Sequence, residues 1–380
     1  AQFIDVIKQS DSRLIDVSCV NNDKLLLKYN ENVKHVIKLV DLQGKEVKHN
    51  IKFPSAGSIY FRGERQYNDA FFYFTSFLYP GTIYYYSFTD STMKPFKEIK
   101  VNNFEPNLYE TKQVWYESKD KTKIPMYMIL KKGIKLDGNN PTILYGYGGF
   151  DISLMPGFRI SRVLWVKNTN GIYCVANLRG GGEFGESWHK QGTKDKKQNV
   201  FNDFQCAAKY LIDSKYTCVK KLAIEGGSNG GLLVAACSNQ EPALFQCSIA
   251  HCGVLDMLKF HKYTIGYAWI SDYGNPDKPE EFDAIYKYSP LNNIPKQINN
   301  NHYPCFMATT ADHDDRVSPL HSFKFVAKLQ DTLGKSTKNP LLIRIELKSG
   351  HGSSSLTKDM EMRADVFAFV LKSLNAKWSS

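Results

Sequence analysis

The sequence lacks any apolar run long enough to cross a membrane, and its first ten residues, AQFIDVIKQS, have neither a basic leader nor an apolar core. These two absences argue against a membrane-spanning protein and against an exported one. The chain also starts at Ala1, without an initiator methionine and in the middle of a strand-like pattern. We therefore expect a fragment or a processed product.

Cysteine is present, but not in the sequence patterns of a metal site or of a disulfide-stabilised fold. The eight cysteines are scattered, without the CxxC pairs of a zinc site and without the density of a disulfide scaffold. We therefore expect reduced thiols, a cytoplasmic location and no bound metal.

The positively charged residues are not clustered in the sequence. The formal net charge is +11, but the lysines are dispersed, and the densest run, Lys194 to Lys197, includes an aspartate. We expect no nucleic-acid partner and no membrane partner. Hydrophobic residues make up 42% of the chain and charged residues 23%, which is the balance of a folded globular protein.

A chain of 380 residues favours two domains, and the residue pattern changes once along it. Up to about residue 100 the pattern is all-β, with short strands, many aromatic residues and a turn at Asp41 to Gly44. About two four-stranded units fit this length, and the pattern suits a propeller or a sandwich equally. The predicted strands are LIDVSCV, KLLLKYN, KHVIKLVDLQGKEV, FFYFTSF and TIYYYSF.

After about residue 108 short apolar strands alternate with longer helical segments, which predicts an α/β fold around a mainly parallel sheet. Strands such as TILYGY and LAIEGG are nearly all apolar, as strands covered by helices on both faces must be. We place the domains at residues 1–101 and 102–380. The main predicted helices are NVFNDFQCAAKYLID, LLVAACSN, HSFKFVAKLQDTLG and MEMRADVFAFVLKSL.

A GxSxG motif at Gly226 to Gly230 carries the clearest chemical signal, because Leu222 to Ile224 reads as the strand before it and Leu232 to Cys237 as the helix after it. A strained strand-to-helix turn exposes the serine hydroxyl, and the new helix directs free N–H groups at developing negative charge. The alternative is a glycine-rich turn in which Ser228 only caps the helix. The context favours Ser228 as a nucleophile.

In an α/β-hydrolase the acid and then the histidine follow the serine along the chain. The strand PCFMATT leads into a loop with three candidate acids, which spacing alone does not rank: Asp312, Asp314 and Asp315. His351 follows the strand LLIRIEL in a glycine-containing loop, whereas His321 falls in a helical pattern where histidine is usually surface or filling. We therefore predict His351 as the general base.

Two glycine-rich segments complete the candidate site. Gly148 and Gly149 follow the strand in PTILYGYGGF, where hydrolases build half of the oxyanion hole, with the backbone N–H of Asn229 as the other donor. The alternatives are that these glycines only turn the chain and that Tyr147 only packs. Gly180 to Gly185 fits GxGxxG, but Glu183 would bring negative charge to a phosphate, so we expect no nucleotide cofactor.

Four segments, GGSNGGLLVAAC, DMLKFHKYTIGYAW, TADHDDRV and YGYGGF, together resemble the catalytic domain of the prolyl oligopeptidase family over roughly residues 102 to 380. The resemblance implies an α/β-hydrolase domain preceded by a β-propeller, and cleavage of short peptides after proline through an acyl-enzyme, without a metal or cofactor. It selects Asp314 among the three acids, and gives Tyr147 a place beside the Asn229 amide in the oxyanion hole. Arg316 would bind a substrate carbonyl, since its guanidinium is always charged and presents several donors.

The resemblance also implies a flat apolar pocket for the proline ring, with the indole of Trp269 stacked on it. An uncharged pocket suits a rigid apolar ring. The implied lining residues, each of which could instead be ordinary core, are Phe150, Val254, Ile265, Trp269, Tyr273 and Val317.

The sequence departs from this family in length, because the family has a seven-bladed propeller and only about two blades precede the catalytic domain here. Two alternatives therefore remain beside the peptidase: a serine hydrolase of another specificity, and an inactive scaffold that presents the remnant as a binding face. An open remnant would also expose unpaired sheet edges that favour association.

Overall fold

The computed structural model describes residues 4–352 and 355–379, and the chain divides into two compact units, each described here by itself. Unit 1 comprises Ala1–Thr111 with the short segments Ser153–Val163 and Glu183–Gly185. Unit 2 comprises Lys112–Ile152, Leu164–Gly182 and Glu186–Ser380.

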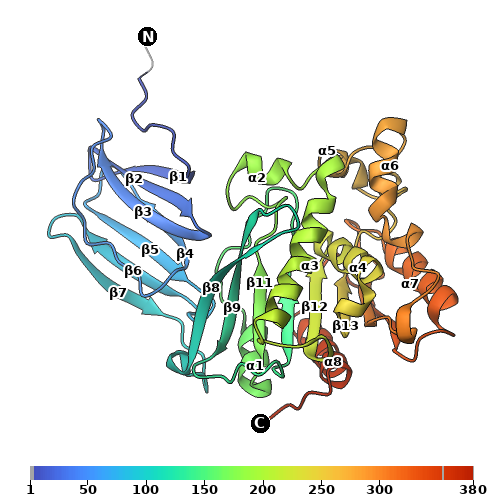
Figure 1. The fold of residues 1–380 in the computed structure, drawn as a ribbon. Coiled ribbons are helices and arrows are strands. Elements are labelled where there is room, and N and C mark those ends of the chain that lie inside the picture. The colour runs from blue at the N-terminus through green and yellow to red at the C-terminus, as the bar shows by residue number, and fades with distance from the viewer. Residues whose placement is uncertain (1–3, 353–354, 380) are drawn as a thin grey trace. The chain divides into compact units, whose positions relative to one another are not determined.

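Unit 1 contains two antiparallel sheets in which consecutive strands pair with their neighbours (Figure 1). Inward-facing side chains of both sheets form one apolar core, which includes Leu26, Ile59, Phe72 and Phe74. The first sheet contains β1 (Arg13–Val20), β2 (Lys24–Glu31) and β3 (Lys34–Asp41), and the second contains β4 (Ser58–Gly63), β5 (Asp69–Thr75), β6 (Thr82–Ser87) and β7 (Thr92–Glu98).

The prediction of two four-stranded units holds for the second sheet, whereas the first has three strands within the described residues. The predicted turn at Asp41 to Gly44 is present: the Asp41 carboxylate accepts hydrogen bonds from the N–H groups of Gln43 and Lys45. After this turn the chain makes a single bridge, Val40 to Glu46, instead of a fourth strand. The segment after the turn, GKEVKHN, has little apolar surface to bury, which accounts for the short pairing.

Unit 2 is built on an eight-stranded sheet with the order β15-β14-β13-β12-β10-β11-β9-β8. The run from β11 through β10, β12, β13 and β14 to β15 is parallel, whereas β9 pairs with β11 in the antiparallel direction. The predicted mainly parallel sheet is therefore confirmed. Its strands are β8 (Tyr109–Glu117), β9 (Lys123–Lys131), β10 (Thr142–Tyr145), β11 (Ile172–Ala176), β12 (Leu222–Gly227), β13 (Cys247–His251), β14 (Cys305–Ala311) and β15 (Leu341–Glu346).

Helices cover both faces of this sheet; Figure 1 shows α3 and α4 in front of it and α8 behind it. Trp165 of α1 contacts Phe367 of α8, with ring centroids 5.6 Å apart. The helices are α1 (Ile160–Thr169), α2 (Glu186–Lys190), α3 (Gln198–Asp213), α4 (Asn229–Gln240), α5 (Ile270–Tyr273), α6 (Pro279–Tyr288), α7 (Leu320–Leu333) and α8 (Leu356–Ser373).

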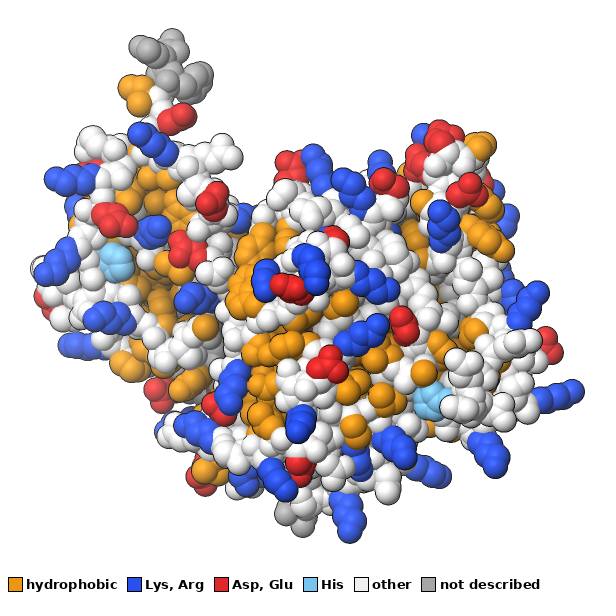
Figure 2. Space-filling model, in the orientation of Figure 1, with side chains coloured by type: hydrophobic (Ala, Val, Ile, Leu, Met, Phe, Trp, Pro, Cys, Tyr) orange, Lys and Arg blue, Asp and Glu red, His pale blue; other side chains and the backbone are white. Residues whose placement is uncertain are grey.

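Within the described part of the chain, no helix combines the length and the apolar character that a membrane span needs. Figure 2 shows lysine and arginine side chains interspersed with acidic and apolar ones over the face in view.

Candidate active site

Four neighbouring parallel strands bring the candidate catalytic residues to one edge of the sheet. Strands β12, β13, β14 and β15 pair in this order and run in the same direction. Ser228 follows β12, Asp314 lies in the loop after β14, and His351 lies in the loop after β15. The carboxyl ends of parallel strands share an edge, which is where open α/β sheets bind their ligands.

Ser228 forms the strained turn that the motif predicts. Its φ is 57° and its ψ is −115°, a conformation that an L-residue adopts only at a cost of order 1–3 kcal/mol. The turn is held by the backbone N–H of Ser228, which donates to the carbonyl of His251 at 2.7 Å. Helix α4 begins at the next residue, Asn229, so the helix N-terminus lies directly behind the serine.

Gly226 allows the chain to pass through this turn. A Cβ atom at Gly226 would lie 2.9 Å from the carbonyl oxygen of Gly146 and closer still to the backbone of Gly230. Any side chain would therefore push the nucleophile turn away from the loop that follows β10. The first glycine of the GxSxG motif is thus explained by close packing of three backbone segments.

Asp314 and His351 form a hydrogen-bonded pair, with 2.8 Å between Oδ2 and Nδ1. The other carboxylate oxygen, Oδ1, accepts the backbone N–H groups of Arg316 and Val317 at 3.0 and 2.9 Å. Burial raises the pKa of Asp314, but these hydrogen bonds outweigh it and hold the pKa below its usual value. An ionised carboxylate only accepts, so Nδ1 of His351 carries the proton and Nε2 is left as a base.

Two of the other residues weighed for these roles, Asp312 and His321, have other partners, and Asp315 is exposed. Asp312 contacts Nδ1 of His313 at 2.7 Å and accepts the N–H of Ser349, so it shapes the loop. His321 is 1% exposed, and its Nδ1 accepts the N–H of Asp256, as a core histidine would. Burial lowers the pKa of His321 to about 4, which keeps the ring neutral.

The loop after β10 packs against the nucleophile turn. The Asn229 side chain donates from Nδ2 to the carbonyl of Tyr147 at 2.6 Å, which ties this loop to the first residue of α4. Burial raises the pKa of Tyr147 to about 12, so its hydroxyl stays protonated near neutral pH and can donate a hydrogen bond.

The sequence interpretation missed Lys197, which it notes only as the last residue of the charged run Lys194 to Lys197. Its side chain is buried, and Nζ donates to the carbonyl of Gly148 at 2.9 Å and to Oδ1 of Asn229 at 3.1 Å. Burial lowers the pKa of Lys197 to about 8, although the Asp272 charge raises it in part. Lys197 therefore connects the loop after β10 with the start of α4.

Aromatic rings form a continuous group beside this loop. Phe150 and Tyr273 meet edge to face at 5.3 Å, Tyr273 and Phe260 do the same at 5.3 Å, and Phe260 stacks with Trp269 at 6.4 Å. Phe260 was not predicted from the sequence, although the aromatic stretch around it gave a signal. Trp269 remains partly exposed.

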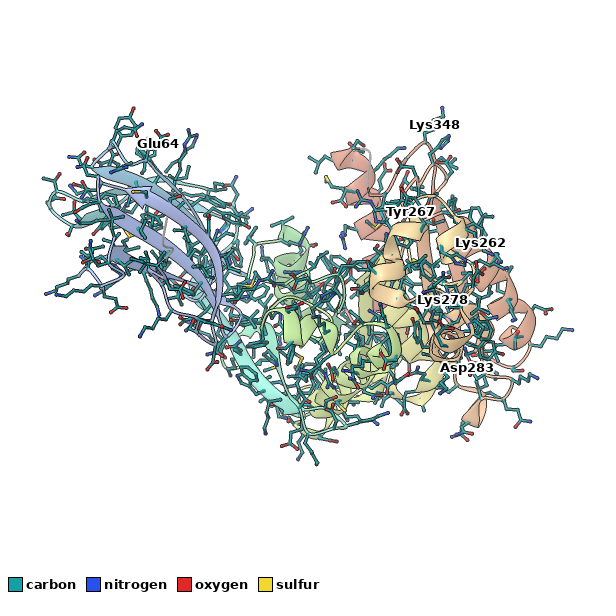
Figure 3. All side chains as sticks on the ribbon, turned by 90° about the horizontal axis from the view of Figure 1, so that it is seen from above. Glu64, Lys262, Tyr267, Lys278, Asp283 and Lys348 are labelled. Carbon is teal, nitrogen blue, oxygen red and sulfur yellow. The ribbon has the colours of Figure 1, made fainter. Side chains whose placement is uncertain are left out.

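The remaining predicted pocket residues differ in exposure. Val254 and Val317 are each 1% exposed, whereas Ile265 is 43% exposed. Arg316 is exposed, and its backbone carbonyl accepts the Thr264 hydroxyl at 2.6 Å. Tyr267, which lies in the same segment as Ile265, is 67% exposed and is labelled in Figure 3.

The glycine-rich segment at Gly180 packs closely against the loop after β10. A Cβ at Gly180, whose φ is +88°, would lie 2.7 Å from the carbonyl oxygen of Gly148. The preceding residue, Arg179, is buried and forms a two-point ion pair with Asp203, through Nη2 at 2.6 Å and Nε at 3.0 Å. This buried ion pair fixes the segment to α3, the helix that contains Asp203.

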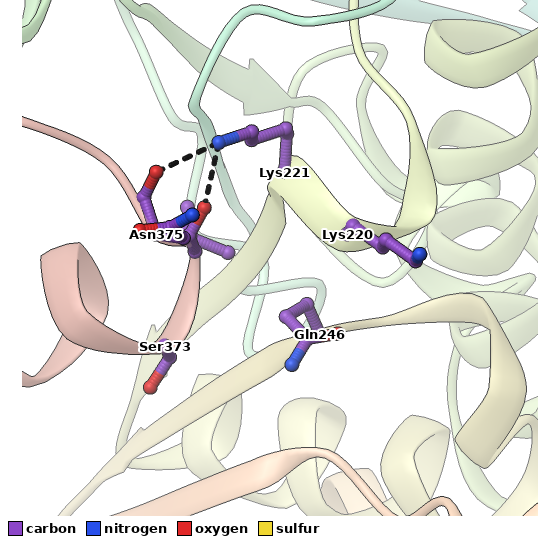
Figure 4. Close-up of a pocket in the computed structure, with 6 residues that line it drawn as sticks. Lys220, Lys221, Gln246, Ser373 and Asn375 are labelled. Carbon is purple, nitrogen blue, oxygen red and sulfur yellow. Dashed lines mark hydrogen bonds between the residues drawn. The ribbon is translucent and has the colours of Figure 1, made fainter.

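A hollow elsewhere in unit 2 lies at the opposite ends of the strands (Figure 4). Lys221 and Gln246 line it and directly precede β12 and β13. Nζ of Lys221 donates to the carbonyls of Leu374 and Asn375 at 2.9 and 2.8 Å. A lysine side chain can hydrogen-bond the free carbonyls at the C-terminus of a helix, here α8. The lysine in this hollow therefore has a structural role.

The parallel sheet, the strained serine before a helix and the hydrogen bond between Asp314 and His351 place unit 2 in the α/β-hydrolase fold class. Residues 156–377 match the prolyl oligopeptidase family, and residues 1–99 match the prolyl oligopeptidase N-terminal beta-propeller domain. The chain therefore belongs to the prolyl oligopeptidase family.

Two curated relatives are named prolyl endopeptidase, and this chain aligns with about half of the length of each. The prolyl endopeptidase of Dictyostelium discoideum is 46% identical over 379 residues, which are 99% of this chain and 50% of that protein. The prolyl endopeptidase of Elizabethkingia meningoseptica is 45% identical over 344 residues, 90% of this chain and 48% of that protein. The chain thus spans about half the length of these curated relatives.

Solved structures agree with this assignment. Prolyl oligopeptidase B from Galerina marginata, solved with a bound 35mer hydrolysis and macrocyclization substrate, superposes with a TM-score of 0.93 at 38% identity, over 99% of this chain and 53% of that one. A structure from a study of two prolyl endopeptidases gives a TM-score of 0.91 at 40% identity, over 98% of this chain and 54% of that one.

Proposed function

We propose that this chain is a serine peptidase that hydrolyses short peptides on the C-terminal side of proline, with residues 102–380 as its catalytic domain. The observation that carries the proposal is the 2.8 Å hydrogen bond between Asp314 and His351, which lie in the loops after β14 and β15. These loops are at the same edge of the sheet as the strained Ser228, which follows β12. Family membership and the prolyl endopeptidase relatives support the preference for proline.

The proposed reaction runs through an acyl-enzyme. Nε2 of His351 takes the proton of the Ser228 hydroxyl as Oγ attacks the peptide carbonyl, and Asp314 stabilises the resulting imidazolium. The backbone N–H of Asn229 and the hydroxyl of Tyr147 donate hydrogen bonds to the oxyanion. His351 then gives its proton to the leaving amine, and a water molecule releases the acyl group by the same route in reverse.

Substrate selection is proposed to depend on the aromatic group and on one cation. The proline ring would lie against Trp269, with Phe150, Tyr273, Val254, Ile265 and Val317 around it. Arg316 would donate to a substrate carbonyl near the cleaved bond. The proposed partners are therefore proline-containing oligopeptides, and the eight free cysteines support a reducing compartment such as the cytoplasm.

The test compares kcat/KM on two matched blocked dipeptide fluorogenic substrates that differ only in proline or arginine at the cleaved bond. We expect a strong preference for proline, and almost complete loss of turnover in Ser228→Ala and His351→Ala. Turnover favouring arginine would retain a serine hydrolase and overturn the specificity. A folded chain that neither turns over substrate nor reacts with a fluorophosphonate probe at Ser228 would overturn the enzyme itself.

A further inference from the structure

Cys252 lies next to the proposed catalytic pair but has no part in the proposed reaction. It follows β13, the strand between those that lead to Ser228 and Asp314. One ligand atom each from Cys252, Asp314 and His351 lie within 4.8 Å of one another. Three successive strand ends therefore direct a thiol, a carboxylate and an imidazole at one point.

The position of Cys252 is fixed by its backbone. Its N–H donates to the carbonyl of Thr309 on β14 at 2.7 Å, and its φ is 44°. Asp314 is equally fixed, because its Oδ1 holds the N–H groups of Arg316 and Val317. Two of the three ligands are thus pre-positioned, and His351 is held against one of them. Cys252 and His351 are partly exposed, so a small ion can reach the group from solvent.

The three donor types are those that Zn²⁺ binds in proteins. A tetrahedral Zn²⁺ with bonds of about 2.0–2.3 Å holds its ligand atoms roughly 3.3–3.7 Å apart. The present limit of 4.8 Å exceeds this separation by only about 1 Å. Small side-chain rotations would close the group, and a water molecule would fill the fourth position.

A metal ion suits this thiol better than oxidation or alkylation does. Burial and the neighbouring Asp314 carboxylate raise the pKa of Cys252 to about 12. A protonated thiol is a weak nucleophile, so peroxide and alkylating reagents react with it slowly. A bound cation reverses this effect because it displaces the thiol proton, and the carboxylate charge that disfavours a thiolate attracts the cation.

We propose that Cys252, Asp314 and His351 form an inhibitory site for a divalent cation, with Zn²⁺ as the best fit. Binding releases the thiol proton, moves the imidazole proton from Nδ1 to Nε2 and places the ion between Asp314 and His351, so that Nε2 no longer accepts the Ser228 proton. Metal binding itself depends only on the three ligands, whereas inhibition rests on the proposed peptidase function.

Metal binding is tested first, without reference to turnover. The full chain is titrated with Co²⁺, and thiolate-to-cobalt charge-transfer absorption is recorded in the near ultraviolet. We expect the band in the parent and in the inactive Ser228→Ala chain, and its absence in Cys252→Val and Cys252→Ser. Zn²⁺ should displace the Co²⁺. Cys218→Ser is the matched control, because this partly exposed cysteine precedes β12 at the other end of the strands, and it should keep the band.

Inhibition is then measured on the proline substrate. Zn²⁺ should abolish turnover of the parent and of Cys218→Ser, and a chelator should restore it. Cys252→Val should retain turnover but need at least about 10- to 100-fold more Zn²⁺ for the same inhibition, the loss caused by removing even an outer partner of a metal ligand. No charge-transfer band in the parent, or equal Zn²⁺ sensitivity of Cys252→Val, would overturn the site. If the chain has no turnover, the cobalt band still decides whether the ion binds.

Discussion

The ammonium group of Lys197 donates a hydrogen bond to the side-chain oxygen of Asn229 across 3.1 Å, in the interior of unit 2. The same ammonium holds the carbonyl of Gly148. One buried cation thus sets the spacing between the two segments proposed to form the oxyanion hole. Burying this charge costs desolvation energy, so the lysine is weak evidence for added stability.

Lys197→Met is expected to lower kcat by about 10-fold or more with little change in KM, because the direct loss of one oxyanion donor costs about 100- to 1000-fold and this effect is indirect. The free energy of unfolding should change little, since the lost hydrogen bonds are offset by relief of the desolvation penalty. Steady-state kinetics and urea unfolding measure the two effects. A variant with reduced stability but unchanged kcat would show that Lys197 has a purely structural role.

Tyr147→Phe removes one proposed oxyanion donor and leaves the ring. We expect kcat to fall by about 10- to 1000-fold, as for other single donors. The pKa of Tyr147, raised to about 12, predicts that this loss is the same throughout the neutral range, because the hydroxyl stays protonated there. Tyr145→Phe, two residues earlier at the end of β10, is the matched control and should leave kcat nearly unchanged. Equal turnover of the Tyr147→Phe and parent chains would remove this residue from the oxyanion hole.

Trp269→Ala should reduce the preference for proline selectively. An aromatic contact is worth about 0.5–1.5 kcal/mol beyond buried area, so kcat/KM on the proline substrate should fall by about 10-fold while an alanine substrate is affected less. The exposed Tyr267, changed to alanine, serves as the control from the same segment. A uniform fall on all substrates would indicate that Trp269 supports folding, through its stacking on Phe260.

Glu225 is expected to make the free energy of unfolding of unit 2 depend on pH in the acidic range. Burial alone would raise its pKa, but the hydrogen bond and charge of His251, together with Arg363, lower the pKa from 4.5 to about 2. A carboxylate with a depressed folded-state pKa stabilises the protein fully above its unfolded value, and this stabilisation is lost as the pH falls towards 2. The loss amounts to about 3 kcal/mol.

The measurement is urea unfolding of the parent and of Glu225→Gln at several values of pH. Glu225→Gln should be less stable at neutral pH, and the difference between the two chains should shrink as the pH falls from about 4.5 towards 2. Parallel stability curves over this range would contradict the assigned role of Glu225.

The strained serine could be predicted because its signals are local: a strand, two glycines and a helix surround Ser228 within a few residues. The choice between Asp312, Asp314 and Asp315 could not be made locally, since it depends on which carboxylate faces the loop after β15. The burial of Lys197 was harder still to predict. The three charged residues before it are exposed, and Lys197 is buried only because α3 packs against the loop after β10.

In the all-β part, the sequence interpretation missed β4 and β7, because a strand, like the burial of Lys197, can depend on its neighbours in the fold. β7 contains Pro95 and mostly exposed side chains, and it lies at the edge of its sheet, where proline is tolerated. Its pairing with β6 is also irregular between Ile83 and Tyr84. Such a strand is defined by the neighbour that accepts it and not by its own composition.

The placement of His351 after β15 has a consequence for the timing of protein synthesis. A ribosome makes Ser228 first, then the strands that bring Cys252 and Asp314, and His351 only after β15, which lies at the far edge of the sheet. Under the proposed mechanism, the nascent chain therefore carries an unactivated serine until β15 pairs with β14. A growing chain with this order would acquire the proposed peptidase activity only when its sheet is complete.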